Sequence, residues 1–284
     1  MSNPALRVLV VANETLGGHS LIEAVKRKAD EAHSADRPIE VMVVCPQNQP
    51  KHGYVVYDET VREAAENRLK TTLAQLRQAG IEATGEVMDP DPYNATMDAL
   101  GIFKADEVIV STHPETRSGW MRRDLIDRVK ESSGLPVEHV VVDLDADRAQ
   151  AVRTLVVANQ TVGGEPLIGL LKGKAKESPH SFIVIMPGSG KDDASAHERL
   201  AQTLDRLQDE ALEAVGQVMP RDPYTAIQNA LQFYAVDEIV ISTFPGERSG
   251  WLRSDLIGRV EASTSKPVEH VVVSPSEAKE GAPA

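Results

Sequence analysis

The chain has 284 residues, and at about 150 residues per domain this length predicts roughly two domains, each with its own hydrophobic core. The formal net charge of −13 and the isoelectric point near 5.1 argue against a broad binding surface for nucleic acid or an anionic membrane. The single cysteine excludes an internal disulfide bond and a thiolate-rich metal site, and it fits a reducing compartment.

The N-terminus passes directly into a short apolar strand, without the segments of a secretion signal, and no run of about 18 apolar residues follows. We therefore predict a cytoplasmic protein without a membrane or nucleic-acid partner. Aromatic residues make up only 4% of the chain, so we expect cores of Val, Ile, Leu and Ala. Such cores suit helices packed on buried parallel strands.

In the first half, apolar runs predict five strands, and helical spacing of apolar residues predicts four intervening helices. The strands are expected at 8–12, 39–45, 81–88, 107–111 and 137–142. Gly80, directly after the second predicted helix, is a C-cap signal for that helix. An aspartate before proline, at Asp91 and again at Asp222, is an N-cap signal for the third helix in each half.

The sequence contains one long internal repeat. RVLVVANETLGGHSLI, from Arg7, returns as RTLVVANQTVGGEPLI, from Arg153, at an offset of 146 residues. DPYNA, STHPETRSGWMRRDLIDRV and VEHVVV return at an offset of 131, so the second copy is 15 residues shorter between its first and third strands. We predict two domains of one kind, at 1–146 and 147–275, and a disordered tail at 276–284.

Alternating strands and helices with continuous apolar strands predict an α/β fold with an open, all-parallel five-stranded sheet in each copy and helices on both faces. Such sheets bind ligands beyond the carboxyl ends of their strands, where the strand order reverses. If the order is 3-2-1-4-5, the loops after the first and fourth strands face each other. Both loops retain polar residues between the copies, which a binding function or a recent duplication would explain.

The loop after the first strand contains Asn, Thr and two Gly directly before a helix. Glycine lets the backbone approach a ligand, and a helix N-terminus offers N–H groups to an anion. Alternatively, Asn and Thr bond their own backbone in an ordinary turn. The candidate binding residues are Ala12, Asn13, Thr15, Gly17 and Gly18 in the first copy and Ala158, Asn159, Thr161, Gly163 and Gly164 in the second.

The loop after the fourth strand contains arginines near the start of a helix, where they oppose the helix dipole and require a negative charge nearby. A bound phosphate would supply that charge, and Asp124 and Asp255 are the alternatives within the chain. The retained tryptophan either stacks on a base or docks the helix on the sheet. The candidates are Ser111, Thr112, Arg117, Ser118, Gly119, Trp120 and Arg122, and Ser242, Thr243, Arg248, Ser249, Gly250, Trp251 and Arg253.

Other reactive residue types give little support for catalysis. His139 and His270 lie inside the fifth strands, where we predict packing or interface roles. Cys45 is replaced by Met186 in the second copy, which indicates a buried apolar position. Neither a nucleophile elbow nor a complete P-loop is present, and the two loops do not share a pair of carboxylates. We therefore predict no catalytic residue and no metal ligand.

Both copies resemble the universal stress protein family in its tandem form. The resemblance rests on VLVVAN with its polar loop, on ADEVIVST and VDEIVIST, and on the closing strands LPVEHVVV and KPVEHVVV. It implies an open five-stranded α/β fold, dimerisation through the last strand in many members, and ATP binding in one group of members.

The ATP-binding pattern of that family is incomplete here. Binding members carry an aspartate at the end of the first strand and a G-x2-G-x9-G-S/T loop after the fourth. Asn13 and Asn159 replace the aspartate, and Ser111 and Pro114 stand where the first two glycines belong. A divergent phosphate grip that uses the Arg-Ser-Gly segment is our inference from the residues alone.

The sequence therefore leads to one hypothesis and one alternative. In the hypothesis, a non-enzymatic stress or regulatory protein binds ATP, another adenine nucleotide or a related small anionic ligand. Its two halves form an intramolecular pseudo-dimer, with a homodimer as a further option. In the alternative, the protein is an interaction scaffold of the same fold that does not bind ATP. A nucleotide hydrolase or transferase would need acid, base or metal chemistry that the sequence does not locate.

Overall fold

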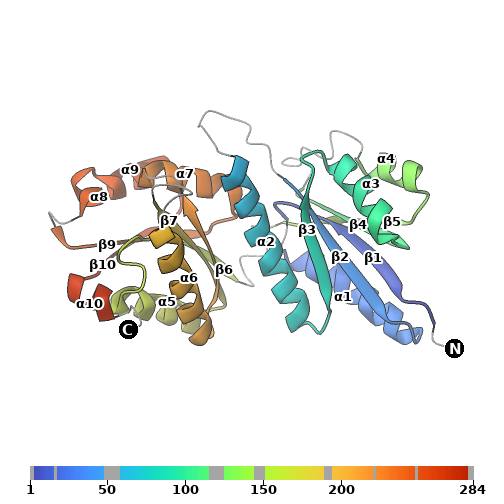
Figure 1. Ribbon diagram of the computed structural model, residues 1–284, viewed down its shortest axis with the longest axis horizontal. Helices are drawn as coiled ribbons and strands as arrows, with labels where there is room; N and C mark the ends of the chain where they lie inside the picture. Colours follow the sequence, from blue (N-terminus) through green and yellow to red (C-terminus); the bar gives the residue numbers. More distant parts are fainter. Residues whose placement is uncertain are drawn as a thin grey trace. The chain divides into compact units, whose positions relative to one another are not determined.

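The computed structural model describes residues 3–15, 18–47, 58–114, 125–143, 151–188, 194–219, 222–246 and 249–280. The chain divides into two compact units, Met1–Asp147 and Arg148–Ala284, which are described one at a time. In each unit, helices pack around a five-stranded sheet (Figure 1).

In the first unit, strands and helices alternate along the chain. The elements are β1 (Leu6–Val11), α1 (His19–Ser34), β2 (Ile39–Pro46), α2 (Asp58–Gln78), β3 (Ala83–Met88), α3 (Pro92–Phe103), β4 (Glu107–Thr112), α4 (Leu125–Ser133) and β5 (Val137–Val141). The strands are all parallel, in the order β3-β2-β1-β4-β5. In this order, the loops after β1 and β4 leave the sheet side by side.

The second unit repeats this topology, with the sheet order β10-β9-β6-β7-β8. Its elements are β6 (Val152–Val157), α5 (Glu165–Glu177), β7 (His180–Pro187), α6 (Ala194–Asp209), β8 (Glu213–Met219), α7 (Pro223–Phe233), β9 (Glu238–Thr243), α8 (Gly250–Arg253), α9 (Leu256–Ser263), β10 (Val268–Val272) and α10 (Pro275–Glu280). The predicted α/β fold with two open parallel sheets is confirmed.

Both faces of each sheet are buried, which explains why the strands are apolar without interruption. In the first unit, Val10 of β1 packs with Leu21 of α1 and Leu69 of α2 on one face. On the other face, Leu9 of β1 packs with Val129 of α4 and with residues of α3. Helices α1 and α2 thus cover one face, and α3 and α4 cover the other.

The helix signals in the sequence correspond to observed helix ends. The Asp91 carboxylate accepts hydrogen bonds from Tyr93 N at 3.0 Å and Asn94 N at 3.1 Å at the start of α3. Asp222 accepts one from Thr225 N at 2.8 Å at the start of α7. After α2, Gly80 adopts a φ of +78°, the left-handed conformation typical of a glycine C-cap.

The structure differs from the predicted disordered tail at its start. Residues 275–280 form α10, where disorder was expected from residue 276. Ser274 and Glu277 form a capping box: Ser274 N donates to Glu277 Oε2 at 2.7 Å, and Glu277 N donates to Ser274 Oγ at 3.4 Å. The sequence SPSE contains the Ser-x-x-Glu pattern of a capping box. The sequence analysis gave more weight to the low hydrophobicity of the segment and therefore predicted disorder. Residues 281–284 lie outside the described part.

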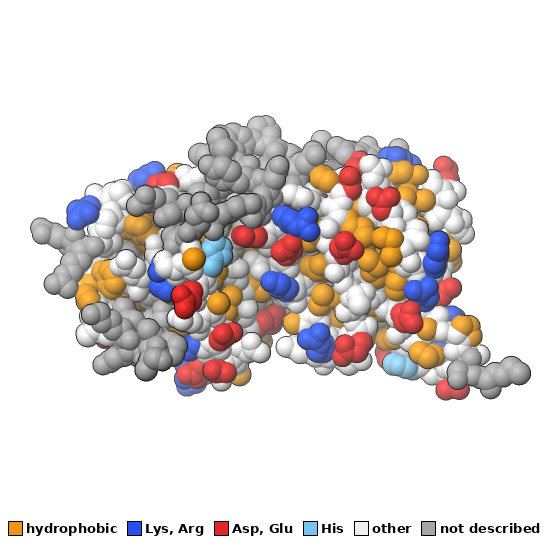
Figure 2. Space-filling model, viewed as in Figure 1, with side chains coloured by type: hydrophobic (Ala, Val, Ile, Leu, Met, Phe, Trp, Pro, Cys, Tyr) orange, Lys and Arg blue, Asp and Glu red, His pale blue; other side chains and the backbone are white. Residues whose placement is uncertain are grey.

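The surface charges are mixed in sign. On the face drawn in Figure 2, acidic and basic side chains of the described residues are interspersed over both units. Arg62 and Glu66, for example, form an exposed ion pair of 3.0 Å along α2. None of the described helices is long and apolar enough to cross a membrane.

One acidic side chain is expected to weaken the second unit above acidic pH. Burial raises the pKa of the Glu213 carboxyl at the start of β8. The folded state thus holds this proton more tightly than the unfolded state, so stability falls as pH rises from the ordinary glutamate pKa through the folded pKa. Glu213→Gln should raise the thermal midpoint at pH 8 and change it little at pH 4. Glu82→Gln, at the matching exposed position in the first unit, is the control. Equal shifts at both pH values would contradict this assignment.

Candidate functional site

The two polar loops named by the sequence meet in both units. Val11 of β1 is paired with Val110 of β4, so Ala12 and Ser111 are neighbours where these strands end. The Thr15 hydroxyl donates to the Ser111 carbonyl oxygen at 3.4 Å. In the second unit, Thr161 makes the same bond to Ser242 at 3.1 Å. The retained threonines thus fasten the first loop to the end of the fourth strand.

Residues on three adjacent strand ends form a row on the face covered by α1 and α2. Cys45 and Ala12 belong to the hydrophobic core of this face, as does Ile109, and Ser111 follows Ile109 by two positions on the same strand. We call Cys45, Ala12 and Ser111, together with Asn13, the first strand-end cluster. The second strand-end cluster consists of Met186, Ala158, Ser242 and Asn159.

The serine of each cluster has a buried hydroxyl. Ser111 and Ser242 are each 1% exposed, and neither Oγ atom makes a hydrogen bond within the described part of the chain. Leaving a buried hydroxyl unsatisfied costs about 1–3 kcal/mol. Buried polar atoms without a partner are rare in native proteins. The two unsatisfied hydroxyls occupy equivalent positions in the two copies, next to the loop after the first strand.

Each cluster also receives an arginine that our sequence analysis missed. Arg68 of α2 donates from Nη2 to Asn13 Oδ1 at 2.7 Å. Arg199 of α6 donates from Nη2 to Asn159 Oδ1 at 3.0 Å. The two arginines are 131 residues apart, as are the later repeat motifs, so the repeat itself carried this signal. We looked for retained polar residues in loops and did not test those on the helices.

The asparagines connect these arginines to the strand ends. Asn159 accepts from Arg199 and donates from Nδ2 to the Pro187 carbonyl at the end of β7, at 2.7 Å. In the first unit, the Cys45 sulfur lies 3.7 Å from Asn13 Oδ1. Burial raises the pKa of the Cys45 thiol, while the charge and hydrogen bonding of Arg68 act in the opposite direction. The positive charge of Arg68 therefore acts on a side chain of the first strand-end cluster.

The second glycine in the loop after the first strand of each unit begins the next helix, α1 or α5. Gly18 and Gly164 are the N-cap residues, and neither helix start has a side-chain cap. A Cβ atom at Gly164 would lie 2.4 Å from Val273 Cγ1, so packing requires glycine at this position. Gly163 accepts from Arg206 Nη1 at 2.6 Å, and Arg206 also forms an ion pair with Glu165. Gly17 lies outside the described residues.

At the ends of β4 and β9, the threonine side chains point away from those of the preceding serines. Thr112 follows Ser111 and lies on the opposite face of the sheet, where its hydroxyl is hydrogen-bonded to His139 Nε2 at 2.8 Å. Thr243 and His270 form the same pair at 2.9 Å. Partial burial lowers the pKa of His270. These histidines hold the ends of neighbouring strands and lie across the sheet from Ser111 and Ser242.

The RSGW segment is described only in part, in the second unit. Ser249 Oγ caps the short helix α8 by accepting from Leu252 N at 3.3 Å. Trp251 is half-buried, and Gly250 and Arg253 are exposed. The single fourth helix expected here is divided into α8 and α9 at Asp255, which has a φ of +50°. Arg117, Ser118, Gly119, Trp120, Arg122 and Arg248 lie outside the described residues, so the proposed arginine grip stays a prediction.

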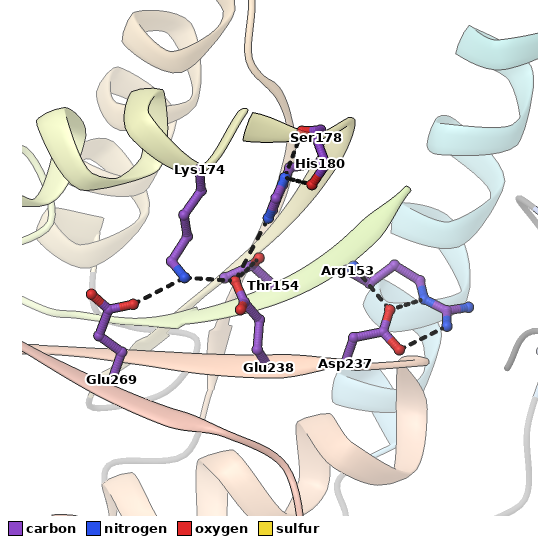
Figure 3. Close-up of polar contacts among 8 residues, drawn as sticks. All are labelled: Arg153, Thr154, Lys174, Ser178, His180, Asp237, Glu238 and Glu269. Carbon is purple, nitrogen blue, oxygen red and sulfur yellow. Dashed lines mark hydrogen bonds and ion pairs between the residues drawn. The ribbon is translucent and has the colours of Figure 1, made fainter. Parts of the chain in front are cut away.

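The retained acidic residues of ADEV and VDEI lie at the opposite, amino-terminal edge of each sheet. Figure 3 shows Arg153 and Lys174 held there by carboxylates. Arg153 Nε donates to Asp237 Oδ2 at 2.8 Å, and Lys174 Nζ lies 3.0 Å from Glu238 and 2.9 Å from Glu269. Burial lowers the pKa of Lys174, but the two carboxylates outweigh it, and the net shift is upward. These charges stabilise the fold away from the strand-end clusters.

A metal site was sought among the residues that the structure describes. Within the residues that the structure describes, no group of three or more His, Cys, Asp and Glu side chains is placed to hold a metal ion. At the strand-end clusters, the described hydrogen-bond donors include the serine hydroxyls and the guanidinium groups of Arg68 and Arg199.

Solved structures similar to this chain include several universal stress proteins. One from Archaeoglobus fulgidus DSM 4304 is 16% identical, with a TM-score of 0.37, and the match covers 95% of this chain and 97% of that one. Another from Archaeoglobus fulgidus is 17% identical, with a TM-score of 0.35, and covers 48% of this chain and 93% of that one. A universal stress protein in complex with cAMP is 16% identical, with a TM-score of 0.35, and covers 49% of this chain and 98% of that one.

No family model and no curated protein matches the sequence. In the described residues, each unit has five parallel strands, and their order in the sheet, numbered along each unit, is 3-2-1-4-5. Identities and TM-scores of this size do not indicate a ligand.

Proposed function

We propose that this protein is a non-enzymatic binding protein that takes a small anionic ligand, an adenine nucleotide in the first instance, at its two strand-end clusters. The observation that carries the proposal is the pair of buried Ser111 and Ser242 hydroxyls, which make no hydrogen bond within the described residues. Both lie in the last two residues of an inner strand, at its carboxyl end and next to the place where the strand order reverses. A ligand oxygen there would accept from each hydroxyl.

The positive charge near the clusters supports an anion over a neutral ligand. Arg68 and Arg199 extend from α2 and α6 to the asparagines of the clusters. Helices α1 and α5 begin at Gly18 and Gly164 without side-chain caps, so their first N–H groups add positive potential at the same sheet edge. The chain as a whole has a net charge of −13, so the positive charge near the strand-end clusters differs in sign from the overall charge.

Calorimetry and thermal unfolding with ATP, ADP, AMP and cAMP test the proposal. We expect heat of binding, and stabilisation of about 2.7 kcal/mol at a ligand concentration of 100 times Kd. Ser111→Ala and Ser242→Ala should weaken binding without destabilising the ligand-free protein, because each removes an unsatisfied buried hydroxyl. Ser263→Ala, on the exposed part of α9, is the control for loss of a serine. Absence of heat and of stabilisation with every nucleotide would refute nucleotide binding.

The interaction scaffold is the second candidate, because some loop residues have structural explanations. Thr15 and Thr161 fasten strand ends together, and Gly164 is required by packing on Val273. In a scaffold, Arg122→Ala and Arg253→Ala would leave ligand-dependent stability unchanged and alter only assembly. A nucleotide-dependent shift of the thermal midpoint that depends on Ser111 or Ser242 would decide against it.

The edge strands β5 and β10 are the parts of the two sheets that could pair with another strand. Val141 and Val272 are exposed on β5 and β10, each an edge strand of its own sheet. Exposed valines on an edge strand suit pairing with another strand. The intramolecular pseudo-dimer, the homodimer, the cytoplasmic location and the absence of a nucleic-acid partner stay predictions.

A further inference from the structure

Among the described residues, the guanidinium group of Arg199 in the second unit contacts only neutral partners. Arg199 donates from Nη1 to Ser195 Oγ at 3.1 Å and from Nη2 to Asn159 Oδ1 at 3.0 Å. Its Nε atom is buried and makes no hydrogen bond within the described residues. Two other described arginines of the second unit have carboxylate partners: Arg153 is paired with Asp237 at the opposite edge of the sheet, and Arg206 is paired with Glu165.

This difference has an electrostatic consequence. Arginine stays charged at all ordinary pH values, and withdrawing its charge from water is costly unless an anion compensates. The half-buried Arg199 meets no carboxylate among the described residues. Phosphate matches the planar fork of a guanidinium group with two parallel hydrogen bonds. A phosphate bound to the guanidinium group of Arg199 would therefore supply the negative charge that its described neighbours do not.

In the first unit, Arg68 holds the position equivalent to Arg199 and bonds to the equivalent asparagine. Arg68 is 7% exposed and bonds to Asn13, and its charge reaches the thiol of Cys45. Across the strand ends, Cys45, Ala12 and Ser111 occupy successive strands, so the small Ala12 lies between the arginine side and the serine side. Ala158 occupies the same position in the second unit, between Met186 and Ser242.

We propose that Arg68 and Arg199 bind the phosphate of the ligand, and that Asn13 and Asn159 are positioning residues that hold the guanidinium groups at the strand ends. The phosphate lies between the arginine of α2 or α6 and the serine hydroxyl of β4 or β9. This inference rests on the proposed function and adds its chemical requirement: the ligand is a phosphorylated small molecule, and the nucleoside without phosphate binds weakly.

The test compares AMP with adenosine on the full chain. Wild-type protein should bind AMP at least about tenfold more tightly than adenosine, since hydrogen bonds to charged groups are stronger than those between neutral groups. The double variant Arg68→Gln, Arg199→Gln should lose most of this preference. Arg62→Gln, which removes the same charge from an exposed position on α2, should keep it.

Conservative variants guard against misfolding. Arg68→Lys and Arg199→Lys keep the charge but lose the forked geometry, so they should fold and bind AMP several-fold more weakly than wild type. Unchanged AMP affinity in folded Gln or Lys variants overturns this inference and leaves the proposed function standing. Failure of wild-type protein to bind AMP, ATP or inorganic pyrophosphate overturns both.

Discussion

Replacing Asp237 by asparagine is expected to lower the free energy of unfolding of the second unit by about 3 kcal/mol. The Asp237 side chain is 3% exposed and accepts hydrogen bonds from Arg153 N at 3.0 Å, Nε at 2.8 Å and Nη2 at 3.1 Å. Asparagine keeps the shape but removes the negative charge, so the largely buried Arg153 loses its carboxylate partner. Urea unfolding followed by circular dichroism measures the change.

The first unit supplies the matched control for this substitution. Asp106 holds the equivalent position and accepts from Arg7 N at 2.9 Å, but its side chain is 50% exposed. The Arg7 guanidinium instead pairs with Glu40 and lies 4.5 Å from the Phe103 ring centre. Asp106→Asn should therefore cost less than about 1 kcal/mol. Equal losses for Asp106→Asn and Asp237→Asn would show that burial of the pair does not determine its contribution.

Adding one methyl group at Gly164 is expected to destabilise the second unit by about 1–3 kcal/mol. In Gly164→Ala, the new Cβ would lie 2.4 Å from Val273 Cγ1 and 3.3 Å from the Thr161 carbonyl oxygen. The chain after β10 or the start of α5 would have to move. Thermal and urea unfolding of the single variant measure the cost directly.

Two further variants identify the cause. Gly169→Ala lies within α5, where an added Cβ meets nothing within 4 Å, and should stabilise by about 0.5–1 kcal/mol through helix propensity. Adding Val273→Ala to Gly164→Ala should recover part of the loss, since it removes both clashing methyl groups. A destabilised Gly164→Ala that Val273→Ala does not relieve would exclude the packing explanation.

The sequence was sufficient to predict the fold because parallel sheets leave a strong pattern. The uninterrupted apolar strands, the Asp-Pro helix starts and the repeat together predicted the α/β class and the strand positions to within about two residues. In the strand order 3-2-1-4-5, the first and fourth strands are neighbours. The sequence analysis therefore expected the loops after these two strands to face each other if the sheet had that order. These features depend on the backbone and on average hydrophobicity, which a sequence displays directly.

The contacts of individual side chains could not be predicted in the same way. The repeat retains Arg68 and Arg199 on their helices, but only the fold shows that these arginines reach Asn13 and Asn159. Thr112 and Ser111 are adjacent in sequence and polar, yet the alternation of the strand places them on opposite faces. Which hydroxyl is paired therefore depends on neighbours that are distant in sequence.

The difference between the two helix starts has a consequence for ligand titrations. Helix α1 has no acidic residue in its first turn, whereas α5 carries Glu165 there, held by Arg206, which also binds the Gly163 carbonyl. The loop after the first strand differs in the opposite sense, because Glu14 of the first unit stands where the second unit has Gln160. An anion would thus meet a different carboxylate in each half, and the two halves should fill at different ligand concentrations. One chain would then give a biphasic saturation curve, and its response would extend over a wider concentration range than two identical halves provide.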